Sequence, residues 1–163
     1  MAEDNTVLRP FTTFNFEVIF INPDDKETPV CEAEFSECDG LEMSIEPKTI
    51  REGGNNGQQV HLAGPTSYGQ LSLKRGMTKR RNKGAYDLWR WFEEVQKNPG
   101  LRLNGEVIMY SSVRMDKKEV SAKFKLIKCM PVKLKAPALN AKEGQVAIEE
   151  MQIAYESVTF MNV

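Results

Sequence analysis

Between residues 39 and 76, two short segments alternate apolar with polar residues, and a long polar connection separates them. The apolar positions are Leu41, Met43 and Ile45 in the first segment, and Leu71 and Leu73 in the second. A period of two residues is that of a β-strand with one buried face. The connection, at about residues 47–70, contains the run Gly53–Gly57, which is too polar to pack a core. Because a connection this long in a compact domain is either functional or disordered, we expect two strands joined by a long extended loop.

The same alternation recurs along the rest of the chain and predicts a mainly β protein. Alternating segments cover residues 14–20, 30–37, 106–110, 120–126, 132–134 and 146–155. Apolar residues alternate with charged ones, so each sheet is expected to bury one face. With one helix, this pattern predicts an antiparallel β-sandwich or barrel with one packed α-helix. The 163 residues suit a single domain, in which residues 1–10 form a loose N-terminal arm.

One helix is predicted at about residues 84–97. Its apolar residues follow spacings of three and four and form one stripe at about 100° per residue. These residues are Ala85, Leu88, Trp89, Phe92 and Val95. Tyr86 and Trp91 fall on the flanks of the stripe, and Asn98-Pro99-Gly100 is a stop signal. We expect the stripe to be the face that packs on a sheet.

Composition excludes several classes of function. Lysine and arginine number 22 and aspartate and glutamate 23, for a formal charge of −1, so bulk electrostatic binding of nucleic acid or an anionic membrane is not expected. No stretch has the roughly 20 apolar residues of a membrane-spanning helix, and the N-terminus lacks the basic start of a secretory signal. Three cysteines, an odd number in a chain of this size, argue against structural disulfides and favour a reducing cytosol.

Residues with catalytic or metal-binding chemistry are sparse. His61 is the single histidine, and the cysteines lack the close spacing of a zinc site. The glycine run lacks the Lys-Ser or Lys-Thr of a P-loop, and no G-x-S-x-G nucleophile motif is present. We therefore expect no enzymatic activity, no metal and no cofactor, and we favour a binding or structural module. A monomeric β-barrel that binds a small ligand is the alternative from another class.

Two segments keep two interpretations each. The predicted loop contains Val60, Leu62 and Tyr68, more apolar surface than a free loop needs. It either becomes ordered against a partner or is a flexible hairpin tip. The basic run Lys79–Lys83 is either a solvated loop or a contact with an acidic neighbouring protein.

Six short motifs, in the same order along the chain, resemble those of tail-tube proteins of contractile phage tails and extracellular contractile injection systems. They are Phe14-Asn15-Phe16-Glu17-Val18, Phe35-Ser36-Glu37-Cys38-Asp39-Gly40-Leu41, Ile50-Arg51-Glu52-Gly53, Leu71-Ser72-Leu73-Lys74-Arg75-Gly76, Asp87-Leu88-Trp89-Arg90-Trp91-Phe92 and Glu143-Gly144-Gln145-Val146-Ala147-Ile148-Glu149. The fourth resembles the L-x-L-K-R-G strand of the family through Leu71, Leu73, Lys74, Arg75 and Gly76. The resemblance spans nearly the whole chain and extends to the fold of type VI secretion ring proteins.

This resemblance implies a structural role in an inner tube. Family members form six-membered rings that stack into a hollow tube, and contraction of a surrounding sheath drives the tube into a target. The implied partners are other copies of the chain, the sheath protein and baseplate or hub proteins, with possible cargo in the lumen. Readout of nucleic-acid sequence and membrane insertion are not implied. The implied location is the bacterial cytoplasm during assembly, then a phage tail or an extracellular or cell-anchored particle.

The resemblance also gives particular residues a role. The lumen-facing residues would be Glu42, Ser44 and Glu46. The ring-to-ring contact would be made by Arg51, Glu52, Gly53, Gly54, Asn55, Asn56, Gly57, Val60 and Leu62. Departures from the common tube sequences, such as the longer first hairpin at Asn22–Pro29, leave open a second place in the same machine, the tube-initiator ring at the baseplate.

Overall fold

The computed structural model describes residues 15–33, 35–54, 57–77, 88–111 and 119–162. In these ranges the chain forms β1 (Phe16–Asn22), β2 (Asp25–Ala33), β3 (Glu37–Asp39), β4 (Met43–Ile50), β5 (Val60–Tyr68), β6 (Gln70–Gly76), α1 (Leu88–Lys97), β7 (Leu103–Tyr110), β8 (Val120–Lys135), β9 (Ile148–Ala154) and β10 (Ser157–Asn162). The prediction of a mainly β fold with one short helix is confirmed. The predicted N-terminal arm and the basic run at 79–83 lie outside the described residues.

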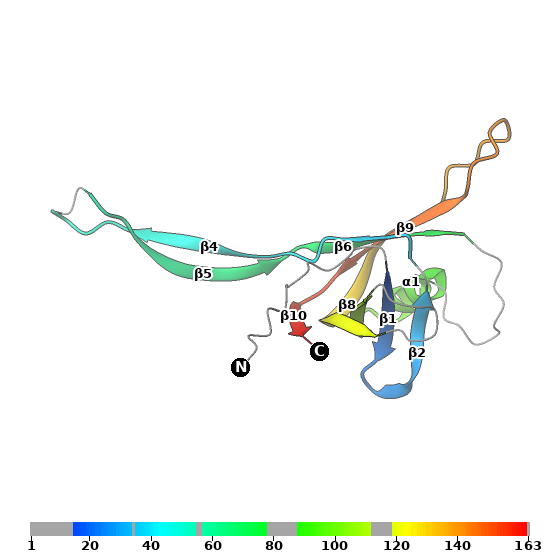
Figure 1. The fold of residues 1–163 in the computed structure, drawn as a ribbon, viewed down its shortest axis with the longest axis horizontal. Helices are drawn as coiled ribbons and strands as arrows, with labels where there is room; N and C mark the ends of the chain where they lie inside the picture. The colour runs from blue at the N-terminus through cyan, green and yellow to red at the C-terminus, as the bar shows by residue number, and fades with distance from the viewer. Residues whose placement is uncertain (1–14, 34, 55–56, 78–87, 112–118, 163) are drawn as a thin grey trace, which may run out of the picture.

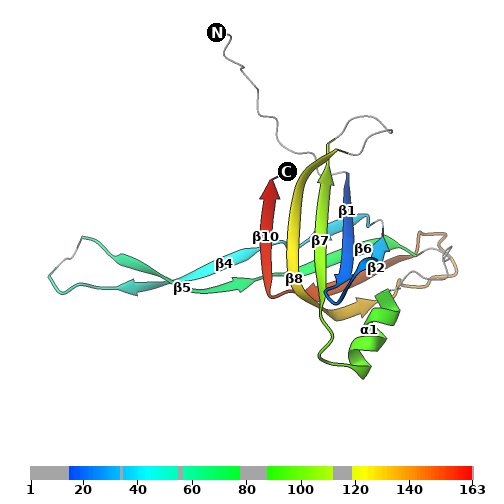
Figure 2. The ribbon, with the colours of Figure 1, turned by 90° about the horizontal axis from the view of Figure 1, so that it is seen from below.

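Eight of the strands form one antiparallel sheet in the order β2-β1-β7-β8-β9-β6-β3, with β10 beside β8. The long strand β8 belongs to two layers. Its first half pairs with β7 and β10, and its second half, from Met130 to Lys135, pairs with β9. Between the halves, Lys128 has a positive φ of 53°, and Figure 2 shows that β8 is curved. The two layers therefore share one bent strand, as in a sandwich with one joined corner.

The layers do not close into a barrel within the described residues. β2 pairs only with β1, β3 only with β6 and β10 only with β8. Three strands consequently keep one edge without a described partner strand. Open edges expose backbone donors and acceptors that other chains can use.

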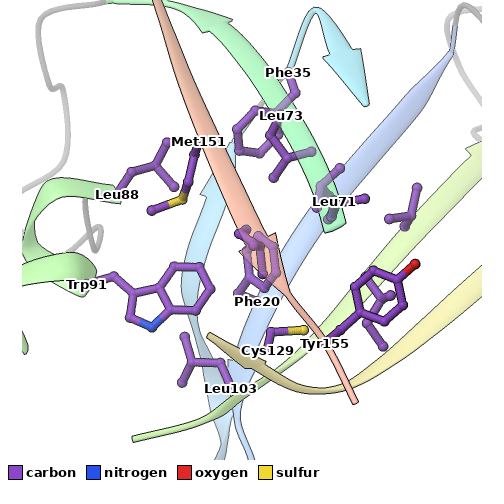
Figure 3. Close-up of a cluster of buried hydrophobic side chains, with 14 residues drawn as sticks. Phe20, Phe35, Leu71, Leu73, Leu88, Trp91, Leu103, Cys129, Met151 and Tyr155 are labelled. Atoms are coloured by element: carbon purple, nitrogen blue, oxygen red, sulfur yellow. The ribbon is translucent and has the colours of Figure 1, made fainter. Parts of the chain in front are cut away.

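The core lies between the layers and is closed by α1 (Figure 3). Phe20 of β1 and Trp91 of α1 are fully buried, with ring centroids 4.8 Å apart. Around them lie the inward positions of the sheet, among them Leu71, Leu73 and Leu126. Because Leu71 and Leu73 alternate with polar residues along β6, the predicted buried face of this strand is correct.

The helix packs through a slightly different face from the predicted stripe. Leu88 and Trp91, three residues apart, are buried, and Val95 is half-buried against the core. Phe92 is half-buried and Trp89 is at the edge, with 36% of its surface exposed. The interpretation of Trp91 as a flanking residue is therefore wrong. The described helix starts at Leu88, so Ala85 lies outside the described residues.

The sequence predicted a long extended loop at about residues 47–70, and this prediction is wrong. β4 and β5 form a two-stranded antiparallel hairpin, paired from Met43 opposite Tyr68 to Ile50 opposite Val60. Figure 1 shows this hairpin projecting far from the rest of the molecule, which we call the body. The body is continuous with it through β3 and β6, whose chain neighbours are β4 and β5. No helix among the described residues is long and apolar enough to cross a membrane.

Candidate functional site: the projecting hairpin

The β4–β5 hairpin is a sheet of its own with no buried face. All eight residues of β4 are exposed, and in β5 only Gly64 and Tyr68 are half-buried. A two-stranded hairpin without a packed face is marginally stable in water on its own. Its length and exposure therefore indicate a surface that is completed by another molecule.

The prediction that Leu41, Met43 and Ile45 form a buried face is wrong for the last two. Met43 is 67% exposed and Ile45 55% exposed, whereas Leu41 packs against the core. The alternation in sequence was real, but in this chain it marks a face turned to solvent. Large apolar side chains that stay exposed together indicate an interaction site.

A second exposed apolar group lies near the tip of the hairpin. Ile50 and Val60 face each other across the strands, and Leu62 follows Val60 on the same face by alternation. Their exposed fractions are 46%, 43% and 48%. We call these three residues the tip patch. Along β4, Ile50 is out of phase with Met43 and Ile45, so the tip patch lies on the opposite face of the hairpin from them.

The predicted ring-to-ring residues gather at the tip. Arg51, Glu52 and Gly53 are exposed there, as are Gly54 and Gly57, whereas Asn55 and Asn56 lie outside the described residues. Gly54 has a positive φ of 97°, a conformation that favours glycine. The described residues between 51 and 59 surround an open hollow of about 540 Å³. This hollow lies at the hairpin tip and not between the two layers, where a ligand-binding barrel would hold its ligand.

The predicted lumen-facing residues also belong to the hairpin region. Glu42 directly precedes β4, and Ser44 and Glu46 are exposed within it. The Ser44 hydroxyl pairs with that of Ser67 across the strands at 2.8 Å. The predicted strand at Leu41–Ile45 is therefore not a strand of the eight-stranded sheet. Its polar side chains do not lie on a face of that sheet.

The L-x-L-K-R-G strand is β6, and its charged residues point to different faces. Lys74 lies on the outer face, where its Nζ donates to Oε1 of Glu37 at 2.9 Å, a hydrogen bond that raises the pKa of Lys74. Arg75 lies in phase with Leu71 and Leu73 and turns inward. Its Nε donates to Oε1 of Glu149 on β9.

Glu149 is a buried carboxylate that the sequence reasoning missed. Only 2% of its surface is exposed, and the indole Nε1 of Trp89 donates to its Oε2 at 3.0 Å. The cluster ties β6, β9 and α1 together at the corner of the body. Its sequence signal is phase, because Glu149 precedes Met151 and Ile153 on the buried face of β9.

The outer face of the layer β8-β9-β6-β3 is polar. The register aligns one residue from each strand in a row, in the order Lys135, Glu150, Lys74 and Glu37. The charges alternate along this row. Opposite charges on neighbouring strands stabilise a solvated sheet face.

A body of two joined β layers with open edges, one packed helix and a projecting hairpin defines the class of fold, and chains of three solved assemblies share it. A chain in the anti-feeding prophage (AFP) baseplate matches with a TM-score of 0.79 and 22% identity, covering 95% of this chain and 97% of that chain. A chain in the sheath-tube complex of PVC, an extracellular contractile injection system, matches with a TM-score of 0.77 and 18% identity, covering 96% and 95%. A chain in the AFP tube-terminating cap matches with a TM-score of 0.78 and 18% identity, covering 99% and 97%.

The sequence itself identifies the family. Residues 12–159 match the family described as T4-like virus tail tube protein gp19. The chain belongs to this family, and the resemblance recognised in its six motifs is confirmed. No curated protein matches it.

Proposed function

We propose that this protein is a structural subunit of the inner tube of a contractile injection system or phage tail. Six copies close into a ring, rings stack around a channel, and contraction of a sheath drives the tube into its target. The role is mechanical and involves no catalytic turnover. Membership of the tail-tube family supports this proposal, and one structural observation carries it. The β4–β5 hairpin projects from the body with apolar side chains on both faces and nothing in the described chain to cover them.

The tip patch supplies a driving force for stacking. A fully buried Val, Leu or Ile gains about 1.5–3 kcal/mol relative to an exposed one. Since each residue of the patch is a little under half exposed, covering it gains about 1 kcal/mol, or about 3 kcal/mol for one hairpin. Six hairpins in a ring would contribute about 18 kcal/mol before the cost of association. Each hairpin contact is weak by itself, but six contacts that form together between two rings add up. This arrangement suits a tube that assembles from stable monomers.

The open strand edges support ring closure in the same way. β2, β3 and β10 each have one edge without a partner strand among the described residues. In a closed ring, an edge of one copy can pair with an edge of the next, which satisfies the exposed backbone groups of both. A ring therefore removes the aggregation hazard that a lone copy carries.

For the channel wall we propose the outer face of the layer β8-β9-β6-β3 in place of Glu42, Ser44 and Glu46. Its row of alternating charges suits a water-filled lumen. The test is a Gln152→Cys variant on this face, with Glu93→Cys on the exposed side of α1 as the control. A large maleimide-polyethylene glycol should label both positions in monomers but only the α1 position in assembled tubes. Equal labelling of Gln152→Cys in tubes would contradict this wall.

The stacking role is tested by changing one face of the hairpin at a time. In the triple variant Ile50→Thr, Val60→Thr and Leu62→Thr, we expect a folded protein that forms single rings or monomers but no long tubes in negative-stain images. The control is the double variant Thr49→Ser and His61→Ser, which changes the opposite face of the same strands and should leave tube growth intact. Loss of tubes in both variants would contradict the assignment to the tip patch. Deletion of Gly53–Gln58 should stop stacking without unfolding the body, and tubes that still form would contradict a role for the tip.

The place in the machine and the partners follow from the same proposal. We favour the shaft of the tube, assembled in the bacterial cytoplasm and contacting the sheath, the baseplate or hub and cargo in the lumen. The tube-initiator ring is the second candidate, supported by similarity to a chain in a baseplate assembly. Purified shaft protein should grow tubes of many rings, whereas an initiator should stop at single rings.

A further inference from the structure

Two glycines lie where the β4–β5 hairpin joins the body. Gly40 lies between β3 and β4, and Gly69 lies between β5 and β6. Gly40 has a φ of +90°, and a Cβ at this position would lie 1.9 Å from the carbonyl oxygen of Gln70. A Cβ at Gly69 would lie 3.0 Å from the carbonyl oxygen of Gly40. The two connections therefore approach each other more closely than side chains allow, and we call this region the joint.

The hydroxyl of Tyr155 reaches the joint from the corner between β9 and β10. It donates a hydrogen bond to the carbonyl oxygen of Gly40 at 2.8 Å and accepts one from the backbone N–H of Glu42 at 3.1 Å. The carbonyl oxygen of Glu42 in turn accepts from the N–H of Gly69 at 3.0 Å. One side chain thus holds the first connection, and that connection holds the second.

The aromatic ring of Tyr155 belongs to the body. It is 6% exposed and part of the core cluster, and Leu41 packs against the same cluster from the joint. Tyr68, the last residue of β5, lies with its ring centroid 5.9 Å from that of Tyr155. A tyrosine hydroxyl with its ordinary pKa of about 10 is a donor at neutral pH, and burial raises the pKa of Tyr155 further. The joint is therefore fixed to the rigid core and not to another surface segment.

We propose that the Tyr155 hydroxyl is a positioning group that sets the direction in which the hairpin leaves the body. This inference rests on the proposed function, in which the hairpin tip contacts the next ring. A strand of eight residues spans about 26 Å at about 3.3 Å per residue. A rotation of about 10° at the joint therefore moves the tip by about 4.5 Å, as much as a whole van der Waals contact distance. A fixed joint keeps six tips in register and lowers the ordering cost of stacking.

The first test measures the direction of the hairpin in monomers. Spin labels are attached to Gln58→Cys at the tip and Glu93→Cys on α1, both exposed sites, in a Cys31→Ser background. Pulsed electron paramagnetic resonance then gives the distance distribution between the labels. We expect one narrow distribution in the parent and a broader one in Tyr155→Phe. Amide exchange at Glu42 and Gly69 should rise by roughly fivefold, the effect of losing about one net hydrogen bond.

Two other tyrosines supply matched controls. Tyr110→Phe removes a hydroxyl that donates to Oε2 of Glu17 at 2.6 Å between the paired strands β7 and β1 of the body, so it deletes a tyrosine hydroxyl but none of the joint's hydrogen bonds described above. Tyr68→Phe removes the hydroxyl of the other tyrosine in the aromatic pair and keeps its ring. Both should keep the narrow distribution. An unchanged distribution in Tyr155→Phe, or equal broadening in Tyr110→Phe, overturns the proposal.

Tube growth separates this proposal from the proposed function. We expect Tyr155→Phe to need a severalfold higher protein concentration than the parent and Tyr110→Phe to form tubes in negative-stain images. If Tyr155→Phe loosens the joint yet assembles like the parent, the positioning role in assembly is refuted while the tube function stands. A parent protein that forms no rings or tubes at any concentration contradicts the proposed function, whatever the spin labels report.

Discussion

The ion pair between Arg75 and Glu149 should respond very differently to the loss of each partner. The Glu149 side chain is 2% exposed, whereas that of Arg75 is 21% exposed. Arg75→Met leaves a buried carboxylate whose remaining described donor is the neutral indole of Trp89. Glu149→Gln leaves a guanidinium that water can reach, and the new amide oxygen still accepts a hydrogen bond. We expect Arg75→Met to cost about 3–5 kcal/mol, the usual range for a broken buried pair, and Glu149→Gln about 1–2 kcal/mol.

Urea unfolding of the monomer, followed by circular dichroism, measures both costs. The double variant Arg75→Met and Glu149→Gln should cost less than the two single changes added together, because both act on one interaction. Lys74→Met is the matched control, since Lys74 is the neighbour of Arg75 on β6 and its ion pair with Glu37 is exposed, so its effect should be small. Equal costs for the two single variants, or a larger cost for Glu149→Gln, would refute the reasoning from burial.

Three further predictions concern the thiols, alkaline pH and the joint. Burial raises the pKa of Cys38 and of Cys129 from 9.0 to about 12. In a Cys31→Ser background, a thiol reagent at pH 8 should therefore label both thiols slowly in the native protein and quickly after urea is added. Fast labelling of the native protein contradicts this prediction. Because the folded state binds these protons more tightly than the unfolded state, their stabilising contribution is complete below about pH 9 and is lost as the pH rises towards 12. The urea midpoint should fall over that range, and less so in a Cys38→Ala and Cys129→Ala variant. Gly40→Ala, at a positive φ with no room for a Cβ, should cost at least about 2 kcal/mol, whereas Gly53→Ala, with nothing within 4 Å, should be close to neutral in the same unfolding assay.

The strands of the body were predictable because a strand with one buried face alternates apolar with polar residues. Leu71 and Leu73 alternate with polar residues and are both buried in β6. The same rule, applied strictly, also places Arg75 and Glu149 on buried faces of β6 and β9. Neither residue was given a buried role from the sequence, and charged residues are almost never fully buried unless paired. The partner strand that makes the pair lies 74 residues away, and nothing local in the sequence reveals it.

Alternation predicted a strand at Met43 and Ile45, where β4 begins, but the rest of the hairpin was not predictable by the same signal. Its strands are held by cross-strand hydrogen bonds, and none of the eight residues of β4 is buried, so no apolar face separates strand from loop. The loop prediction rested on the polar run Gly53–Gly57, and Pro47 and Gly64 inside the paired region are also typical of turns and irregular segments. A register shift between Ile45 and Pro47 absorbs this irregularity. The apolar content of Val60, Leu62 and Tyr68 favoured a segment that becomes ordered against a partner, and this stays a prediction.

The distribution of apolar residues on the hairpin also bears on how the proposed tube subunit avoids aggregation before assembly. Met43 and Ile45 lie on one face and the tip patch on the other, so neither forms one large apolar surface. Small separate patches are common on soluble monomers, whereas large continuous ones cause aggregation. A contact that covers one patch at one hairpin gains only a few kcal/mol, less than the cost of bringing two proteins together. In the proposed tube, a completed ring offers six such contacts at fixed positions, so docking of one ring onto another is favoured where pairing of two free subunits is not. In the proposed function, assembly therefore uses both the small gain at each patch and the fixed joint that we propose places it.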